Sequence, residues 1–211
     1  MTRPAGVRER KKADRREHIL AAAMRLIQNE GLKAATYASI AREAGVSRGT
    51  VFNYFPYKEA FLVAYFAREL DALDRRLGEA SSTSLDGDAL GPLLTLFDEL
   101  GAIAQQHRAW ILPLGYELLN PDPERSRTAF LALPLATMLK RALGRARDAG
   151  TVRRDVSLDR LARTLANTYF ITVLQWAAYR PDRSIRDELR VALRIALDGV
   201  RARPAPLDGA A

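Results

Sequence analysis

Residues 36–58 read TYASIAREAGVSRGTVFNYFPYK, a stretch with two short helical patterns separated by a Gly-Val-Ser turn. Thr36 can cap the first helix through its hydroxyl, and Gly45 suits the left-handed residue that ends this helix. Ser47 can cap the second helix in the same way as Thr36 caps the first. Two helices joined by so short a turn predict a helix-turn-helix, whose second helix has the proportions to enter a DNA major groove.

The rest of the 211-residue chain shows helical periodicity without any alternating strand pattern, which predicts an all-α fold of about nine helices. Residues 78–92 are rich in Gly, Ser, Asp and Pro and are expected to form a loop. Further helices are expected at 14–28, 58–77, 89–107, 109–119, 124–148, 158–179 and 184–201. The predicted organisation is a flexible basic arm (1–13), a helix-turn-helix domain (14–57), a helical ligand-binding and dimerisation domain (58–203) and a flexible tail (204–211).

Positive charge is concentrated at one end of the chain. Residues 1–58 hold 12 Lys and Arg against 5 Asp and Glu, whereas residues 59–211 hold 21 against 20. Clustered cations that neutralise phosphates release condensed counterions, so a basic segment favours nucleic acid binding. The alternative is a solvated charged tail. Because the positive charge coincides with the helix-turn-helix, double-stranded DNA is the favoured partner.

Composition restricts the other classes of function. The chain has no Cys and only His18 and His107, far apart in sequence, so no metal site or cofactor is expected. No apolar run follows the first residues, and the longest uncharged run has 16 residues and contains several polar side chains. We therefore expect a cytoplasmic protein without a membrane partner.

The sequence contains one match to the signature of an enzyme. Residues 45–49, Gly-Val-Ser-Arg-Gly, match G-x-S-x-G, the nucleophile elbow of α/β-hydrolases. That motif needs a strand before the serine and a histidine after it, whereas a helix is expected before Ser47, which already has a capping role. The prediction is that the chain is not an enzyme and has no catalytic residues. A helical enzyme and a protein-binding scaffold with helix-turn-helix geometry are the rival classes.

Individual residues of the second helix suit DNA contact. Arg48 can pair with guanine O6 and N7, although its alternative role is an exposed surface charge. Gly49 allows close backbone approach, or avoids a clash within the motif. Thr50 can bind a phosphate or a thymine methyl group, and Asn53 lies one turn further along the same side.

The aromatic residues and the lysine that follow have distinct expected roles. Tyr54 can offer its hydroxyl to a phosphate, and Phe52 can either contact DNA or pack inside. Lys58 combines a side-chain charge with free backbone N–H groups at a helix start, which makes a phosphate site.

Together these residues resemble a known family. The segment Ile19–Ala23, the Gly31 stop, Thr36, Ile40-Ala41, Ala44–Ser47, Gly49-Thr50, Tyr54-Phe55 and Lys58-Glu59 are similar at fixed spacing to the N-terminal domain of TetR (tetracycline-repressor-like) transcriptional regulators. The likeness covers about residues 14–62. Two departures are Tyr57, where the family usually has a small polar cap, and Phe52, where a tyrosine is common.

The resemblance implies a ligand-responsive repressor that binds a palindromic operator as a homodimer, with the last two helices of each subunit at the interface. The DNA contacts that it implies are Thr36, Arg48, Gly49, Thr50, Phe52, Asn53, Tyr54 and Lys58, and Ser47 completes the predicted DNA-binding set.

Two further sets of residues are assigned to the helical domain. The apolar stripe of the last helix exceeds what a surface helix needs, although packing within one chain is the alternative. The interface set is Tyr169, Trp176, Ile185, Leu189, Leu193, Ala196 and Val200. Polar side chains embedded among aromatic ones predict a pocket for a small, largely apolar effector, which would partner those polar groups. The pocket set is Phe97, His107, Trp110, Tyr116, Phe130, Asn167, Phe170 and Gln175.

Overall fold

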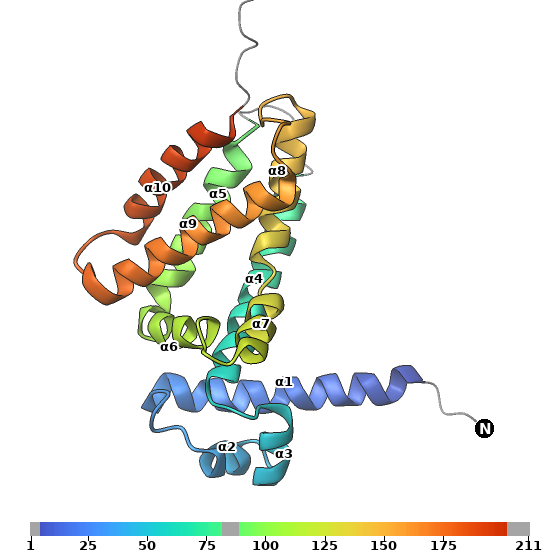
Figure 1. The fold of residues 1–211 in the computed structure, drawn as a ribbon. Helices are drawn as coiled ribbons and strands as arrows, with labels where there is room; N and C mark the ends of the chain where they lie inside the picture. The colour runs from blue at the N-terminus through green and yellow to red at the C-terminus, as the bar shows by residue number, and fades with distance from the viewer. Residues whose placement is uncertain (1–4, 82–88, 202–211) are drawn as a thin grey trace, which may run out of the picture. The chain divides into compact units, whose positions relative to one another are not determined.

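The computed structural model describes residues 5–81 and 89–201, which form ten α-helices (Figure 1). The strand-like pairing within these ranges is a single antiparallel bridge between Val152 and Arg201. The all-α prediction is therefore confirmed. Among the described helices, none is long and apolar enough to cross a membrane. The expected loop at 78–92 lies partly, and the expected tail at 204–211 entirely, outside the described residues.

The chain divides into two compact units, and each is built from segments distant in sequence. The first unit comprises residues up to Arg68 together with Tyr116–Ala132, and the second comprises Glu69–Gly115 together with the residues from Leu133 onward. This division differs from the predicted single boundary at residue 58, because the segment around residues 116–132 groups with the N-terminal helices. No local sequence pattern marks such a grouping.

The first unit contains α1 (Ala5–Glu30), α2 (Tyr37–Glu43), α3 (Arg48–Tyr54), the first part of α4 (Glu59–Ser81), the end of α6 (Arg108–Leu118) and α7 (Pro123–Ala132). Its core is formed by apolar side chains at helical spacing on α1, which are buried with those of α2 and α3. The Phe55 and Phe61 rings stack at 4.4 Å in its interior. The fully buried members include Ile19, Leu20, Ala23, Ile27, Ile40, Val51, Phe55 and Phe61.

Helix α1 begins at Ala5 rather than near residue 14, so the prediction of a flexible arm over residues 1–13 is wrong for the part that the structure describes. The reason is helix propagation. Arg, Lys, Glu and Ala are good helix formers, and each residue added to an existing helix adds a hydrogen bond without a new nucleus. This segment is exposed on all sides, so it lacks the apolar periodicity that would have revealed it.

The second unit contains the rest of α4, α5 (Gly91–Gln106), the start of α6, α8 (Leu135–Asp148), α9 (Leu158–Tyr179) and α10 (Ile185–Val200). Helices α9 and α10 lie within a residue of their predicted bounds. Ser157 and Ser184 cap them by accepting hydrogen bonds from backbone N–H groups. Helix α10 packs on both α5 and α9, and α8 packs on α9.

The predicted single helix over 124–148 is wrong, because α7 and α8 are separate helices that meet at Leu133 and Pro134. Proline lacks the N–H that a continuing helix would need, and its ring disfavours helical backbone at the preceding residue. The break explains why ten helices occur in the described residues where about nine were expected.

Candidate DNA-binding site

The turn between α2 and α3 is fixed by hydrogen bonds from both of its helices. Thr36 and Ser39 form a reciprocal capping box at the start of α2, in which the Ser39 N–H donates to the Thr36 hydroxyl at 3.0 Å. Gly45 ends α2 with a φ of 61°, a left-handed conformation that glycine adopts without strain. Ser47 then accepts from the Thr50 N–H at 3.1 Å. Each cap is worth about 1 kcal/mol, so the turn geometry is over-determined by its own sequence.

Helix α3 has one face in the core and one in solvent. Val51 and the C-cap residue Phe55 are fully buried. Arg48, Gly49, Phe52 and Asn53 are exposed, and their spacing of one and four residues places them together on one side of the helix. The sequence allowed Phe52 either to contact DNA or to pack inside. In the structure, 54% of its surface is exposed. An exposed aromatic ring beside an arginine and an amide makes this face suited to base edges and sugars.

Arg48 is available for recognition. Its side chain is exposed at the first position of α3, and within residues 5–81 and 89–201 it forms no ion pair. By contrast, the hydroxyls of Ser47 and Thr50 share a hydrogen bond of 2.8 Å, and Thr50 is half-buried. Thr36 and Ser47 are exposed, and the Thr36 hydroxyl already donates to Ser39 Oγ at 3.1 Å. Tyr54 is half-buried at the end of α3.

Lys58 has a structural role that the sequence did not indicate. Its Nζ donates to the carbonyl oxygens of Leu32 at 3.2 Å and Lys33 at 2.9 Å, which ties the α1–α2 loop to the residue before α4. An ammonium group has three N–H donors, so one remains for a phosphate. Lys58 is thus placed where it was expected, but it also holds the loop that precedes the helix-turn-helix.

Tyr37 and Tyr57 make contacts in this unit that the sequence did not indicate. The Tyr37 hydroxyl donates to the Phe55 carbonyl oxygen at 2.9 Å and so joins the start of α2 to the end of α3. Burial, followed by the charge of Glu59, raises the pKa of Tyr37, so its hydroxyl remains a donor. Tyr57 lies two residues before the start of α4. Its ring stacks under the Arg125 guanidinium, with 3.8 Å between the guanidinium carbon and the ring centroid.

The partner of Arg125 is a buried carboxylate. Glu117 is 1% exposed and accepts from Arg125 through Nε at 3.1 Å and Nη2 at 2.5 Å. The Asn120 amide donates to the same carboxylate at 3.3 Å, and Ser126 donates to the Leu118 carbonyl oxygen at 2.6 Å. This cluster of Tyr57, Glu117 and Arg125 attaches the 116–132 segment to the residues that lead into α4. Only the fold brings these residues together, so no local pattern could have revealed the cluster.

The candidate pocket residues fall into both units. Phe97 and His107 are buried in the second unit, where Phe97 meets Tyr169 edge-on at 6.0 Å and His107 stacks on Trp110 at 4.7 Å. Burial lowers the pKa of His107, with Glu69 opposing the shift. Phe170 is half-buried, whereas Asn167 and Gln175 are exposed on α9. Tyr116 and Phe130 belong to the first unit and are 74% and 46% exposed.

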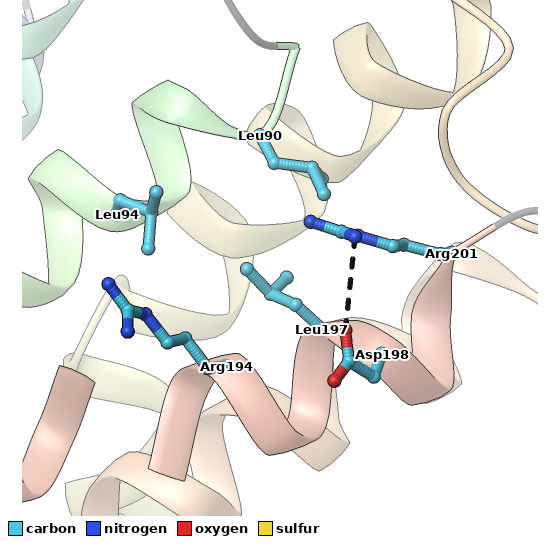
Figure 2. A pocket seen from close by; sticks show the side chains of 6 residues that line it. All are labelled: Leu90, Leu94, Arg194, Leu197, Asp198 and Arg201. Atoms are coloured by element: carbon cyan, nitrogen blue, oxygen red, sulfur yellow. Dashed lines mark ion pairs between the residues drawn. The ribbon is translucent and has the colours of Figure 1, made fainter. Parts of the chain in front are cut away.

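A hollow in the second unit is lined by none of the predicted pocket residues (Figure 2). It has a volume of about 210 Å³ and lies between the start of α5 and the end of α10. Arg201 and Asp198 form an ion pair across part of its rim at 3.9 Å. The volume is below the range of about 300–1,000 Å³ that small-molecule sites occupy. Its lining residues are Leu90, Leu94, Arg194, Leu197, Asp198 and Arg201.

Most of the residues assigned to a subunit interface are buried within the chain itself. Trp176 is 4% exposed and donates through Nε1 to the Arg183 carbonyl oxygen at 2.8 Å. Tyr169 and Ala196 are half-buried. Packing within one chain, the alternative that the sequence left open, accounts for the stripe on α10 because α5 and α9 cover it. The fully packed members are Ile185, Leu189, Leu193 and Val200.

Other apolar residues on the same two helices are exposed. Ile171 and Tyr179 on α9 are 52% and 82% exposed, and Val191 and Ile195 on α10 are 57% and 70% exposed. Val191 and Ile195 are four residues apart and therefore share one face of α10. Sequence periodicity could not separate this face from the buried one, since both carry aliphatic residues.

Neither a metal centre nor the hydrolase elbow is supported by the described residues. Among them, no three His, Cys, Asp or Glu side chains gather as metal ligands. Helix α2, not a strand, precedes Ser47, and the Ser47 hydroxyl is engaged by Thr50. The features required of a nucleophile elbow are therefore missing from this segment.

A capped helix-turn-helix with an exposed, cation-bearing recognition face defines a DNA-binding protein. Comparisons of the chain with known protein families and structures agree with this class of protein. Residues 19–65 match the model of bacterial regulatory proteins of the tetR family, and residues 72–199 match that of the C-terminal domain of TetR/AcrR family transcriptional repressors. The chain belongs to the TetR/AcrR family of transcriptional regulators.

Three relatives cover nearly the whole chain. The crystal structure of the transcriptional repressor FadR from Thermus thermophilus, in complex with lauroyl-CoA, is 42% identical, spans 92% of this chain and 100% of that one, and has a TM-score of 0.83. FadR from Bacillus subtilis, solved with stearoyl-CoA, is 19% identical with a TM-score of 0.68 over 87% and 98% of the two chains, and shows the fold alone. The repressor KstR2 of Rhodococcus jostii is 28% identical over 95% of this chain and 98% of its own.

Proposed function

We propose that this regulator is a repressor that occupies a palindromic operator as a homodimer and leaves it when it binds a long-chain fatty acyl-CoA. The observation that carries the effector class is the 42% identity, over 92% of this chain, to a repressor solved with lauroyl-CoA. The exposed face of α3 supports operator reading by Arg48, Gly49, Phe52 and Asn53.

Exposed apolar side chains on α9 and α10 support the dimer. Ile171, Tyr179, Val191 and Ile195 would be unusual as a group on a solvated helix pair, because large exposed apolar patches mark interaction sites. A second copy of this chain can cover them symmetrically. Asn167 and Gln175 flank Ile171 on the exposed side of α9, which favours a place at this interface over a place in the pocket.

An acyl-CoA gives the expected effector a definite chemical class. The predicted effector is largely apolar, and an acyl chain meets that description, whereas the CoA moiety carries phosphates that need cations or solvent. The core of the second unit is apolar along α5, α8 and α9, which suits an acyl chain. The hollow between α5 and α10 has a volume of only about 210 Å³, so we expect helices of this unit to move apart when the acyl chain binds.

The response to the effector follows from a population shift. Helices α4 and α6 each contribute residues to both units, so an effector that opens the second unit acts on helices that continue into the DNA-binding unit. An effector can move the equilibrium only by its difference in affinity for the two arrangements. Moving the population from about 1:99 to 99:1 needs about a 10⁴-fold difference.

The test is displacement from DNA. A fluorescent duplex, selected by the protein from random sequence, is bound and then titrated with lauroyl-CoA, palmitoyl-CoA, free CoA or free laurate while anisotropy is recorded. Release by one or both acyl-CoA species, but not by CoA or laurate at the same concentration, is the expected result. Retention of the complex in all four titrations, below the concentration at which acyl-CoA forms micelles, would refute this effector class.

A further inference from the structure

The N-terminal part of α1 carries cations that the recognition helix does not explain. Arg8, Lys11, Lys12 and Arg15, named here the basic stripe, have exposed side chains. None of them takes part in an ion pair within residues 5–81 and 89–201. The helix therefore holds unneutralised charge in a fixed geometry rather than on a flexible arm.

Helical periodicity places the basic stripe on one face. Successive residues of an α-helix rotate by about 100°, so the four side chains lie within an arc of about 100°. The acidic residues of the same segment, Glu9 and Asp14, both fall outside this arc. A merely solvated helix face usually mixes the two signs at i, i+4 spacing, whereas this face carries one sign only.

Contacts of the next turn show which way this face points. His18 Nε2 donates to the Ala44 carbonyl oxygen at 3.0 Å, and the Arg16 guanidinium carbon lies 4.8 Å from the Phe55 ring centroid. By rotation, these two residues bracket the arc of the basic stripe, and their partners end α2 and α3. Glu17 instead pairs at 2.6 Å with Arg68 of α4, on the other side of α1. The basic stripe therefore faces the side of α1 that carries the helix-turn-helix.

Helix α1 is long enough for its basic stripe to extend beyond the helix-turn-helix. At about 1.5 Å per residue, Arg8 lies about 12 Å further along the axis than Arg16. Figure 1 shows the N-terminal part of α1 running on past α2 and α3. Twelve ångströms is about the rise of three to four base pairs. Arg8 is thus separated along the axis from Arg16, whose guanidinium lies over the Phe55 ring at the end of α3, by a distance that fits neighbouring phosphates, and Lys11, Lys12 and Arg15 lie between them.

We propose that the basic stripe binds backbone phosphates of duplex DNA flanking the base pairs read by α3. This inference rests on DNA binding through α3 and adds a second, sequence-independent contact to each subunit. Phosphate contacts position a protein without specifying sequence. The stripe would therefore raise affinity and salt dependence and leave the preferred sequence unchanged.

Arg8 and Arg10 provide a matched pair for the test. They are the same residue type on the same exposed turn, but Arg10 lies on the opposite face by rotation. The variants are Arg8→Gln, Arg10→Gln and the double variant Arg8→Gln/Lys12→Gln, since Gln keeps a high helix propensity. Circular dichroism checks that each variant is folded. The DNA is a selected duplex with ten flanking base pairs on each side, and the same duplex with the flanks removed.

The readout is the slope of log K against log salt concentration. Each lost phosphate contact lowers the slope by about 0.9 on duplex DNA. We expect a drop of about 0.9 per subunit for Arg8→Gln and about 2 for the double variant, no change for Arg10→Gln, and no difference from wild type on the trimmed duplex. Equal slopes for Arg8→Gln and Arg10→Gln would overturn the basic stripe alone. Failure of the wild type to enrich any duplex would overturn DNA recognition and the stripe with it.

Discussion

At the residue scale, the recognition face of α3 combines one cation, one glycine, one amide and one exposed aromatic ring. Arg48 differs from the other cations of the unit because it lies at the start of α3 and is not paired within the described residues. Lys58 is by contrast tied to two carbonyl oxygens. A long, forked side chain with free donors is the type that reads guanine.

Replacing Arg48 with Ala should therefore remove selectivity rather than all binding. A bidentate contact to guanine is worth about 1–3 kcal/mol of discrimination, so the affinity ratio between operator and unrelated DNA should fall by roughly 10- to 100-fold. Competition binding with selected and scrambled duplexes measures this ratio. An unchanged ratio would show that Arg48 is not the base reader.

At the scale of elements, local signals and long-range contacts were not equally predictable. The caps at Thr36, Ser47, Ser157 and Ser184 are short-range features, and the helices that they begin were predicted within a few residues. The start of α1 could not be predicted because an exposed helix has no apolar stripe. The break at Pro134 could not be predicted from periodicity, because the helical patterns before and after it read as one continuous helix. The contact between Tyr57 and the Glu117–Arg125 pair depends on the fold, so sequence could not reveal it.

That buried pair gives a stability prediction for the first unit. Arg125→Met leaves the Glu117 carboxylate 1% exposed without its cation, and removing one partner of a buried pair costs about 3–5 kcal/mol. Because Arg125 itself is 34% exposed, we expect about 2–3 kcal/mol of lost unfolding free energy in urea titrations. Arg127→Met, at an exposed position two residues on, is the control and should change little.

A second substitution distinguishes the charge from the packing. Adding Glu117→Leu to Arg125→Met removes the uncompensated charge, so the double variant should recover most of the loss. A double variant as unstable as the single one would mean that the pair acts through packing against Tyr57 and not through its charge.

At the scale of the whole molecule, the proposed function depends on two copies acting together. A two-fold dimer presents two α3 helices to successive major grooves and therefore favours a palindromic site. The buried stripe of α10 stabilises each chain, and the exposed residues of α9 and α10 are those that we propose for contact with a second copy. The sequence did not distinguish the buried face of these helices from the exposed one.

Ile195→Asp tests this assignment of faces. Ile195 is 70% exposed, so the substitution should leave the fold of a single chain intact while placing a charge in the proposed interface. Sedimentation velocity should show a shift from dimer to monomer, and operator affinity should fall with it. The matched change Arg194→Asp, at a neighbouring exposed position, tests whether any added negative charge has this effect. A dimer as stable as wild type in Ile195→Asp would place the interface elsewhere.

The most direct test of the account is selection of duplex DNA from a random pool by the wild-type protein, followed by sequencing. We predict enrichment of an inverted repeat whose half-sites are centred about one helical turn, or a multiple of one, apart, with loss of that enrichment in Arg48→Ala. Recovery of no common sequence by the folded wild-type protein would contradict it.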